Sequence, residues 1–440
     1  MTDTPTGDPA ADPAAPAATA PPGSARELFR ERDYLFFWVD RFCGTLGGQV
    51  QGVALGWQMY ELARRTHDVP TSAFYVGLIG LAAFTPVLLL TLIAGETADR
   101  HDRRKVLLFC FAGEMATVGL LAVAAREEFA SIPLLLGSAV VFGAFRAFFA
   151  PASSALGPML VPRHLLPRAI AWNSLAWQGA SILGPTLAGF LIGGIALGAL
   201  DFEGGLPWAY GAAFLLYLTA AAAILLIRKN CRPEAQAGSR WQLMKEGLVY
   251  TWRNRIVFGA ISLDLFAVLL GGATALLPVY ARDILHVGPE GFGLLRAGPA
   301  IGATLVAMVL AGFPIRRHAG LIMFGGVFLF GLATCVFAVS EVFWLSVTAL
   351  AVLGGADMLS VYIRSTLIQI VTPDAMRGRV SAASYLFIGA SNELGEFQSG
   401  VAARLLGPVG AALFGGIGAM AVTVTWAGLF PQLRKADRLV

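Results

Sequence analysis

Charged residues are scarce in this sequence, and their scarcity excludes a soluble globular protein. Asp, Glu, Lys and Arg make up 14% of the 440 residues, whereas a soluble domain carries about 25%. Hydrophobic residues make up 56% of the chain, and the mean hydropathy is +0.68. The composition therefore predicts an integral membrane protein. The net charge of +4 does not indicate a nucleic-acid partner, because the basic residues lie in short caps between apolar runs.

Lysine, histidine and cysteine are also scarce, and their positions exclude most catalytic sites. None of the four lysines follows a glycine, so the sequence has no phosphate-binding loop for ATP hydrolysis. The five histidines fall in predicted loops, and neither HExxH nor GxSxG occurs. The four cysteines form no CxxC pair, and we expect no disulfide. The sequence thus predicts neither an enzyme nor a metal or cofactor site.

The first 24 residues contain no large apolar side chain after Met1. Such a segment cannot bury enough surface to offset the entropy lost on ordering, so we predict that residues 1–24 form a disordered cytoplasmic tail. They also lack the basic start and apolar core of a signal peptide. Membrane insertion is therefore expected to begin with the first internal span.

Long apolar runs fill the rest of the chain and predict an all-α integral membrane fold. A helix needs about 20 largely apolar residues to cross the hydrocarbon core. On that scale we predict twelve transmembrane helices, near 34–62, 72–94, 106–125, 133–155, 167–195, 209–228, 256–282, 291–313, 321–340, 343–369, 380–404 and 411–430. They form an N-terminal six-helix bundle (25–228) and a C-terminal one (255–430), with a linker at 229–254 and a cytoplasmic tail at 431–440.

Lys and Arg accumulate in alternate loops and near both termini. Because positive residues mark the cytoplasmic side of a membrane protein, we predict that both termini are cytoplasmic and that the chain lies in a plasma (inner) membrane.

The linker contains Trp241, Met244, Leu248 and Trp252 at helical spacing among basic residues. This spacing predicts an amphipathic helix along the cytoplasmic interface. The alternative is a solvated linker with little helix.

An internal repeat relates the two halves. At a constant offset, Pro162, Arg168, Leu183, Gly184 and Gly189 match Pro373, Arg379, Leu394, Gly395 and Gly400. The fifth and eleventh spans therefore look like copies of each other. Duplicated halves are typical of secondary transporters, in which the substrate site lies between the halves near the bilayer midplane.

A short motif lies between the second and third predicted spans, from Gly95 to Arg104. Its sequence, GETADRHDRR, resembles the signature of the major facilitator superfamily. The resemblance implies two pseudo-symmetric six-helix bundles. It also implies that a latch closes the cytoplasmic ends when the cavity opens outward, and the matching residues are Gly95, Asp99, Arg100, Arg103 and Arg104. A loop that merely obeys the positive-inside rule would explain the arginines but not Gly95 and Asp99. Asp102 departs from the family pattern, and the corresponding loop at 312–317 lacks the Asp.

The fifth span contains Gly184, Pro185 and Gly189, which resemble the Gly-Pro signature of proton-coupled exporters in the same superfamily. The alternative is a proline kink among small residues that allow close packing. Stretches at 208–211, 277–281 and 373–380 resemble the enterobactin-exporter branch. This resemblance implies efflux of a drug-like or siderophore-like molecule.

Several ionisable residues fall inside predicted spans, where each costs about 2.5 to 3.5 kcal/mol. Asp40, Gln51 and Gln58 share a stripe of the first span and predict a wet cavity wall. Glu114 and Arg146 lie at similar depths on adjacent spans and predict a structural ion pair. Asp357 and Arg364 share a face of the tenth span but stand too far apart to pair, so each is expected to meet another helix or line the cavity.

The eleventh span carries Glu393 and Glu396 on one face, and the repeat places Glu396 where the fifth span has Pro185. A carboxylate at such an interface can take up and release a proton as its exposure changes. Glu396 with Glu393 is the leading candidate for proton coupling, followed by Asp264 and Asp40. The alternative is a carboxylate held by a buried arginine such as Arg364.

Taken together, these features predict a monomeric secondary transporter that works by alternating access and exports a small molecule in exchange for protons. Its partners are the substrate, protons and the lipid bilayer. The alternatives are a proton-coupled importer of a metabolite and a lipid-transporting member of the superfamily.

Overall fold

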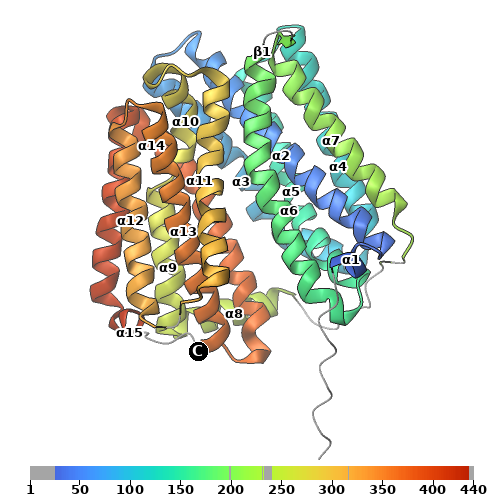
Figure 1. Cartoon of the computed structure of the whole chain (residues 1–440), viewed down its shortest axis with the longest axis vertical. Helices are drawn as coiled ribbons and strands as arrows, with labels where there is room; N and C mark the ends of the chain where they lie inside the picture. The colour runs from blue at the N-terminus through green and yellow to red at the C-terminus, as the bar shows by residue number, and fades with distance from the viewer. Residues whose placement is uncertain (1–24, 198–199, 230, 232–239, 316, 436–440) are drawn as a thin grey trace, which may run out of the picture.

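The computed structural model describes residues 25–197, 200–229, 231, 240–315 and 317–435, and these are almost entirely helical (Figure 1). The predicted tail at 1–24 lies outside the described residues, as do the last five residues of the tail at 431–440.

The first half begins with a short helix and continues with six long ones. Asp68 accepts a hydrogen bond from the Thr71 amide and caps the second of these long helices, while Asp102 accepts one from the Arg104 amide and caps the third. The elements are α1 (Ala25–Leu28), α2 (Arg32–Arg64), α3 (Val69–Arg100), α4 (Arg103–Arg126), α5 (Ile132–Leu160), η1 (Arg163–Leu165), α6 (Leu166–Gly193) and α7 (Leu206–Leu226).

A small hairpin, which the sequence does not predict, joins α6 to α7. Gly194, at a φ of 94°, turns the chain out of α6. Strand β1 (Ile195–Leu197) then pairs antiparallel with β2 (Leu200–Phe202), and Ile195 lies opposite Phe202.

The second half begins with the linker helix and contains one broken and one bent span. The predicted seventh span is broken into several short helical pieces, and Gly407 (φ 75°) with Pro408 bends the last long helix into two arms. The elements are α8 (Arg240–Arg253), α9 (Arg255–Leu270), η2 (Ala273–Leu276), α10 (Leu277–Val279), the π-helical turn η3 (Tyr280–Ile284), α11 (Gly288–Gly312), α12 (Ala319–Val339), α13 (Phe343–Val371), α14 (Asp374–Leu429) and α15 (Pro431–Arg434).

Ten helical stretches of the described chain are long and apolar enough to cross a membrane. Helix α2, which carries Asp40 and Arg41 in its first third, is not among them, and the two arms of α14 count as one stretch. Helix α2 has 33 residues, more than the roughly 20 that a crossing needs. With α2 and both arms of α14 added to these stretches, the described chain has twelve long helical segments, the number that the sequence predicts.

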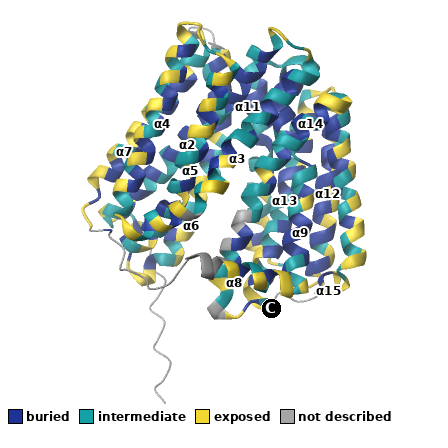
Figure 2. Cartoon of the chain, turned by 180° about the vertical axis from the view of Figure 1, so that it is seen from behind, coloured by how far each residue is buried: buried dark blue, intermediate teal, exposed yellow. Residues whose placement is uncertain are grey.

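Helices α2 to α7 pack together as one bundle, and α9 to α14 pack together as the other. The bundles stand side by side, approach each other near the end that carries β1, and diverge toward the end that carries α8 (Figures 1 and 2). We call these the hairpin end and the linker end. Many large apolar side chains are exposed, including Phe109, Leu225 and Leu405. Such surfaces fit a lipid environment.

The two bundles touch through glycines. A Cβ added to Gly77 of α3 would lie 2.8 Å from the Cα of Gly400 on α14, and a Cβ added to Gly189 of α6 would lie 3.1 Å from the Cα of Gly293 on α11. Backbones can approach this closely only where side chains are absent. Because Gly189 and Gly400 are equivalent in the internal repeat, both copies of the repeat contribute a crossing point between the bundles.

Candidate functional site

An ion pair joins the two bundles beside one of these crossings. The Nη1 atom of Arg146 on α5 lies 2.5 Å from Oε1 of Glu393 on α14, and their side chains are 46% and 14% exposed. The predicted pairing of Arg146 with Glu114 is therefore wrong. Arg146 acts on Glu114 electrostatically, but its guanidinium pairs with Glu393 in the other half of the chain.

Glu396 lies one helical turn from Glu393, at the crossing of α14 with α3. A Cβ added to Gly80 of α3 would lie 3.0 Å from the Cβ of Glu396 and 3.3 Å from its Oε2. The Glu396 carboxylate interacts electrostatically with two cations, Arg296 and Arg146, and with one other acid, Glu393. Two carboxylates from one helix and two arginines from the other helices thus form a charge cluster between the bundles. Arg364, suggested as an alternative partner of Glu396, pairs elsewhere.

A second charge cluster lies within the C-terminal bundle. Arg364 on α13 and Asp264 on α9 form an ion pair, and both side chains are buried. Asp357 lies two turns before Arg364 on α13 and interacts electrostatically with both members of this pair. As the sequence predicts, Arg364 meets another helix. Asp264 is engaged in this internal pair, which favours a structural role over proton coupling.

The polar stripe of α2 does not line a cavity, which corrects the prediction. Gln51 accepts a hydrogen bond of 2.7 Å from the Tyr217 hydroxyl, and Gln58 accepts one of 2.7 Å from the Tyr210 hydroxyl. Both tyrosines lie on α7, and both glutamines are buried within the N-terminal bundle. The stripe faces α7 because tyrosine hydroxyls on that helix can satisfy it.

Two acids lie inside the same bundle. Glu114 is buried next to the Gln51 side chain. Asp40 is fully buried, and neither of its carboxylate oxygens has a hydrogen-bond partner among the described residues.

The Gly-Pro motif of α6 lies at the crossing with α11. A Cβ added to Gly293 would lie 2.4 Å from the carbonyl oxygen of Pro185, and one added to Gly184 would lie 2.4 Å from the Cβ of Gln49 on α2. With Gly189 at the same crossing, the motif allows close contact of α6 with both α11 and α2. This geometry fits the packing interpretation of the motif.

The predicted latch motif is helical up to Arg100, so most of it is the end of α3 and not a loop. Arg100 is 73% exposed and pairs with Glu96 of its own helix at 2.6 Å. Arg103 donates hydrogen bonds to the carbonyl oxygens of Ala98 and Ala155, both in the same bundle. In this structure, Arg100 and Arg103 therefore make these bonds within the N-terminal bundle.

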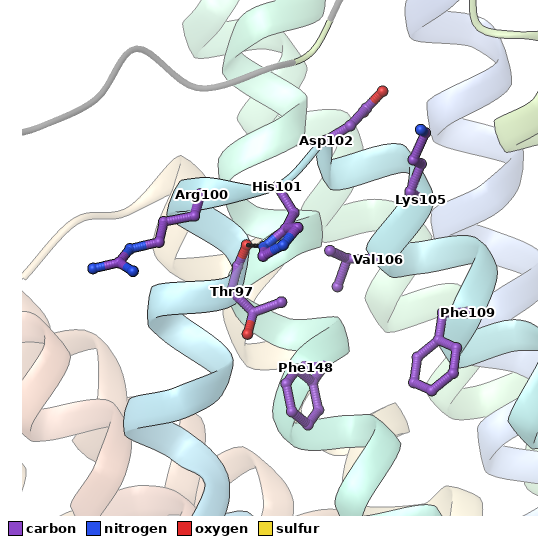
Figure 3. A pocket seen from close by; sticks show the side chains of 8 residues that line it. All are labelled: Thr97, Arg100, His101, Asp102, Lys105, Val106, Phe109 and Phe148. Carbon is purple, nitrogen blue, oxygen red and sulfur yellow. Dashed lines mark hydrogen bonds between the residues drawn. The ribbon is translucent and has the colours of Figure 1, made fainter.

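A cavity of about 460 Å³ lies beside the latch motif, between the linker ends of α3, α4 and α5. Figure 3 shows its side chains and the contact of 3.2 Å between the His101 ring and the Thr97 carbonyl oxygen. The cavity is lined by charged, polar and apolar residues, which are Thr97, Arg100, His101, Asp102, Lys105, Val106, Phe109 and Phe148.

A set of polar contacts closes the hairpin end. The Tyr60 hydroxyl on α2 donates a hydrogen bond to Asp283 of η3, and Arg64 lies 3.6 Å from the same carboxylate. Glu61 and Arg282 form a further pair at 3.2 Å. The sequence does not predict this group, because positive residues near helix ends also occur as topology signals. The opposite charges at the ends of the first spans of both halves are a signal that could have revealed it.

The described residues contain no cluster of three or more His, Cys, Asp or Glu side chains that could hold a metal ion.

A model of the major facilitator family described as transmembrane secretion effectors matches residues 24–439. The chain belongs to this family. Its members are transporters and not enzymes, so the prediction of a non-enzymatic transporter with the major facilitator fold is confirmed.

The chain is also similar to individual proteins. The enterobactin exporter EntS of Citrobacter koseri is 27% identical over 401 residues, which cover 89% of this chain and 86% of the exporter. Among solved structures, a D-xylose-proton symporter superposes with a TM-score of 0.68 at 12% identity, covering 92% of this chain and 99% of the symporter. A bacterial homologue of the human lysosomal transporter Spinster, in an inward-facing and occupied conformation, gives 0.67 at 14% identity, covering 94% and 97%. The two structures show the shared fold.

Proposed function

We propose that this secretion effector exports a small molecule in exchange for protons and that the Arg146–Glu393 pair with Glu396 couples the two movements. The observation that carries the proposal is the position of these charges. They lie between the bundles, where alternating access requires contacts to break and re-form.

The linker end is the cytoplasmic end in this proposal. Arg26, Arg30 and Arg32 precede or begin α2 at this end, and Lys229, Arg253 and Arg255 flank α8. The positive-inside rule then places both ends of the chain in the cytoplasm of the cell. The contacts of Tyr60, Glu61 and Arg64 with η3 close the opposite, outer end. The conformation is accordingly inward-facing, and the latch residues Arg100 and Arg103 bond within their own bundle because the latch engages in the outward-facing state.

The coupling step follows from two neighbouring carboxylates that face shared arginines. A like charge disfavours ionisation of a neighbouring acid, whereas an arginine favours it. In the inward-facing state Arg146 pairs with Glu393, and Glu396 is the second acid of the cluster. Once the cavity has opened outward, protonation of Glu393 from outside would prevent it from pairing with Arg146 across α5 and α14. Return of the proton to the cytoplasm would restore the pair, so the transport cycle moves protons inward as cargo moves outward.

The similarity to an enterobactin exporter supports a siderophore-like or drug-like cargo. Proteoliposomes loaded with either enterobactin or ethidium test the proposal when a pH gradient, acidic outside, is imposed. We expect the gradient to accelerate loss of at least one trapped compound. Glu393→Gln and Glu396→Gln should each lower the gradient-driven rate at least tenfold, while Glu341→Gln, in an exposed position, should not.

Two results would contradict the proposal. Gradient-driven accumulation of the same compounds in the direction of proton flow would identify a symporter. Full proton dependence in both Glu393→Gln and Glu396→Gln would remove these residues from the coupling step.

A further inference from the structure

We infer that a small cavity on the N-terminal bundle binds an anionic oxygen group of the cargo, such as a carboxylate, through Arg41, Ser153 and Asn173. The inference rests on the proposed function, which supplies the exported cargo. It adds that this cargo carries an anionic oxygen group. The cavity has a volume of about 110 Å³ and lies among the linker ends of α2, α5 and α6.

The polar side chains of this cavity offer hydrogen-bond donors. Arg41 donates one hydrogen bond of 3.1 Å to the Ser153 hydroxyl oxygen. The guanidinium has five N–H groups, so donors remain for a ligand, and the Ser153 hydroxyl hydrogen adds another. Ser153 is fully buried, which fixes the position of the hydroxyl that anchors Arg41.

Asn173 presents its amide nitrogen to the same cavity. The Tyr34 hydroxyl donates to the Ala169 carbonyl oxygen at 3.0 Å and to Oδ1 of Asn173 at 3.2 Å. This contact occupies the amide oxygen and turns Nδ2 toward Gly157, where an added Cβ would lie 3.6 Å from the nitrogen. Gly157 lines the cavity together with the Phe37 ring, which would lie 3.0 Å from the same added Cβ and forms an apolar wall beside the nitrogen. A ligand that enters the cavity meets N–H and O–H donors, which favour an anionic oxygen group.

The nearest acid does not neutralise these donors through a hydrogen bond. Asp40 precedes Arg41 in the chain and lies within electrostatic range of it. However, both carboxylate oxygens of Asp40 are without a hydrogen-bond partner among the described residues. Gly44, one turn along the same face as Asp40, packs against Phe111 of α4, whereas Arg41 faces α5. The Arg41 guanidinium is therefore anchored by Ser153 and not by a hydrogen bond to Asp40.

The cavity is accessible, and its size fits one group of a larger molecule. Ser154 and Ile170 at its rim are exposed. Helix α6 is also the element that runs along the second bundle in Figure 1 and crosses α11 near the hairpin end. Sites for drug-sized ligands occupy about 300 to 1,000 Å³. A cavity of about 110 Å³ accordingly holds a carboxylate and its adjoining atoms, while the rest of the cargo extends beyond the rim.

Equilibrium dialysis of the full chain in phosphatidylcholine nanodiscs tests the inference, with 1-naphthoate and its neutral isostere 1-naphthamide as probes. We expect naphthoate to bind more tightly than naphthamide. Arg41→Gln should weaken naphthoate binding about tenfold, since a hydrogen bond to a charged group is lost. Asn173→Asp, which keeps the side-chain shape and adds a repelling charge, should weaken it at least as much. Naphthamide binding should stay constant in both variants, which reports intact folding. Arg32→Gln on the exposed face of α2 is the matched control.

The outcomes separate this inference from the proposed function. Unchanged naphthoate affinity in Arg41→Gln and Asn173→Asp would overturn the anion site, even if the proton-driven efflux assay succeeds. Selective loss in these variants would support the site, even if a pH gradient drives no flux. Displacement of naphthoate when phosphatidylglycerol replaces phosphatidylcholine would overturn the assignment to cargo, because the same donors would then hold a lipid headgroup.

Discussion

Arg146 and Glu393 lie 247 positions apart in the chain, yet their side chains form an ion pair across the interface between the two bundles. Arg146 is nearly half exposed, so solvent screens the pair and its contribution to stability is small. The pair matters because of where it lies. Its two members belong to bodies that have to move relative to each other during transport.

The pair should show measurable energetic coupling. In a double-mutant cycle with Arg146→Gln and Glu393→Gln, we expect a coupling free energy of about 1 kcal/mol or less, in line with partly exposed ion pairs. The measurement is the free energy of unfolding in dodecyl maltoside titrated with sodium dodecyl sulfate. Strictly additive effects would show that the contact is not formed in the dominant conformation.

The buried pair of Arg364 and Asp264 should behave differently. Asp264→Asn removes the carboxylate that pairs with the buried Arg364 and leaves Asp357 as the acid near it, and we expect a loss of about 3 kcal/mol in the same unfolding assay. The double variant Asp264→Leu with Arg364→Met removes both charges and should be more stable than Asp264→Asn alone. If the single variant instead unfolds like the wild type and loses only proton coupling, Asp264 has the transport role that the sequence suggested.

The two glycines at the crossing of α3 and α14 set the distance between the bundles. In Gly400→Ala the new Cβ would lie 2.9 Å from the Cα of Gly77, and backbone cannot yield as a flexible side chain can. We expect a loss of about 1 to 3 kcal/mol in the unfolding assay. Gly389→Ala on the same helix is the control, because no atom lies within 4 Å of its added Cβ. Equal effects of the two substitutions would mean that helix propensity, and not the crossing, decides the result.

Sequence reasoning succeeded where one periodic signal decides the structure. The apolar runs predicted the spans, and the repeat paired Gly189 with Gly400, both of which lie at crossings between the bundles. It failed where two partners were possible for one side chain and only the tertiary structure decides between them. Arg146 could be assigned a depth but not a direction, so its pairing with Glu393 in place of Glu114 could not be derived. The burial of Gln51 could not be predicted for the same reason, because its hydrogen-bond partner Tyr217 lies 166 positions away on α7.

The contacts at the hairpin end should control access to the interior from that side. Asp283 accepts a hydrogen bond from Tyr60 and lies near Arg64, so Asp283→Asn removes the charge that holds both. Gln178 of α6, which donates a hydrogen bond of 2.9 Å to the Ala300 carbonyl oxygen of α11, lies deeper at the same interface. In a chain without native cysteines, Gln178→Cys should react slowly with a membrane-impermeant maleimide added at the hairpin end. Adding Asp283→Asn should raise this rate several-fold, and high salt should raise the parent rate in the same direction because it screens the remaining pairs. Arg126→Gln, at the exposed end of α4, should leave the rate unchanged. A rate that does not respond to Asp283→Asn would show that backbone packing alone closes this end.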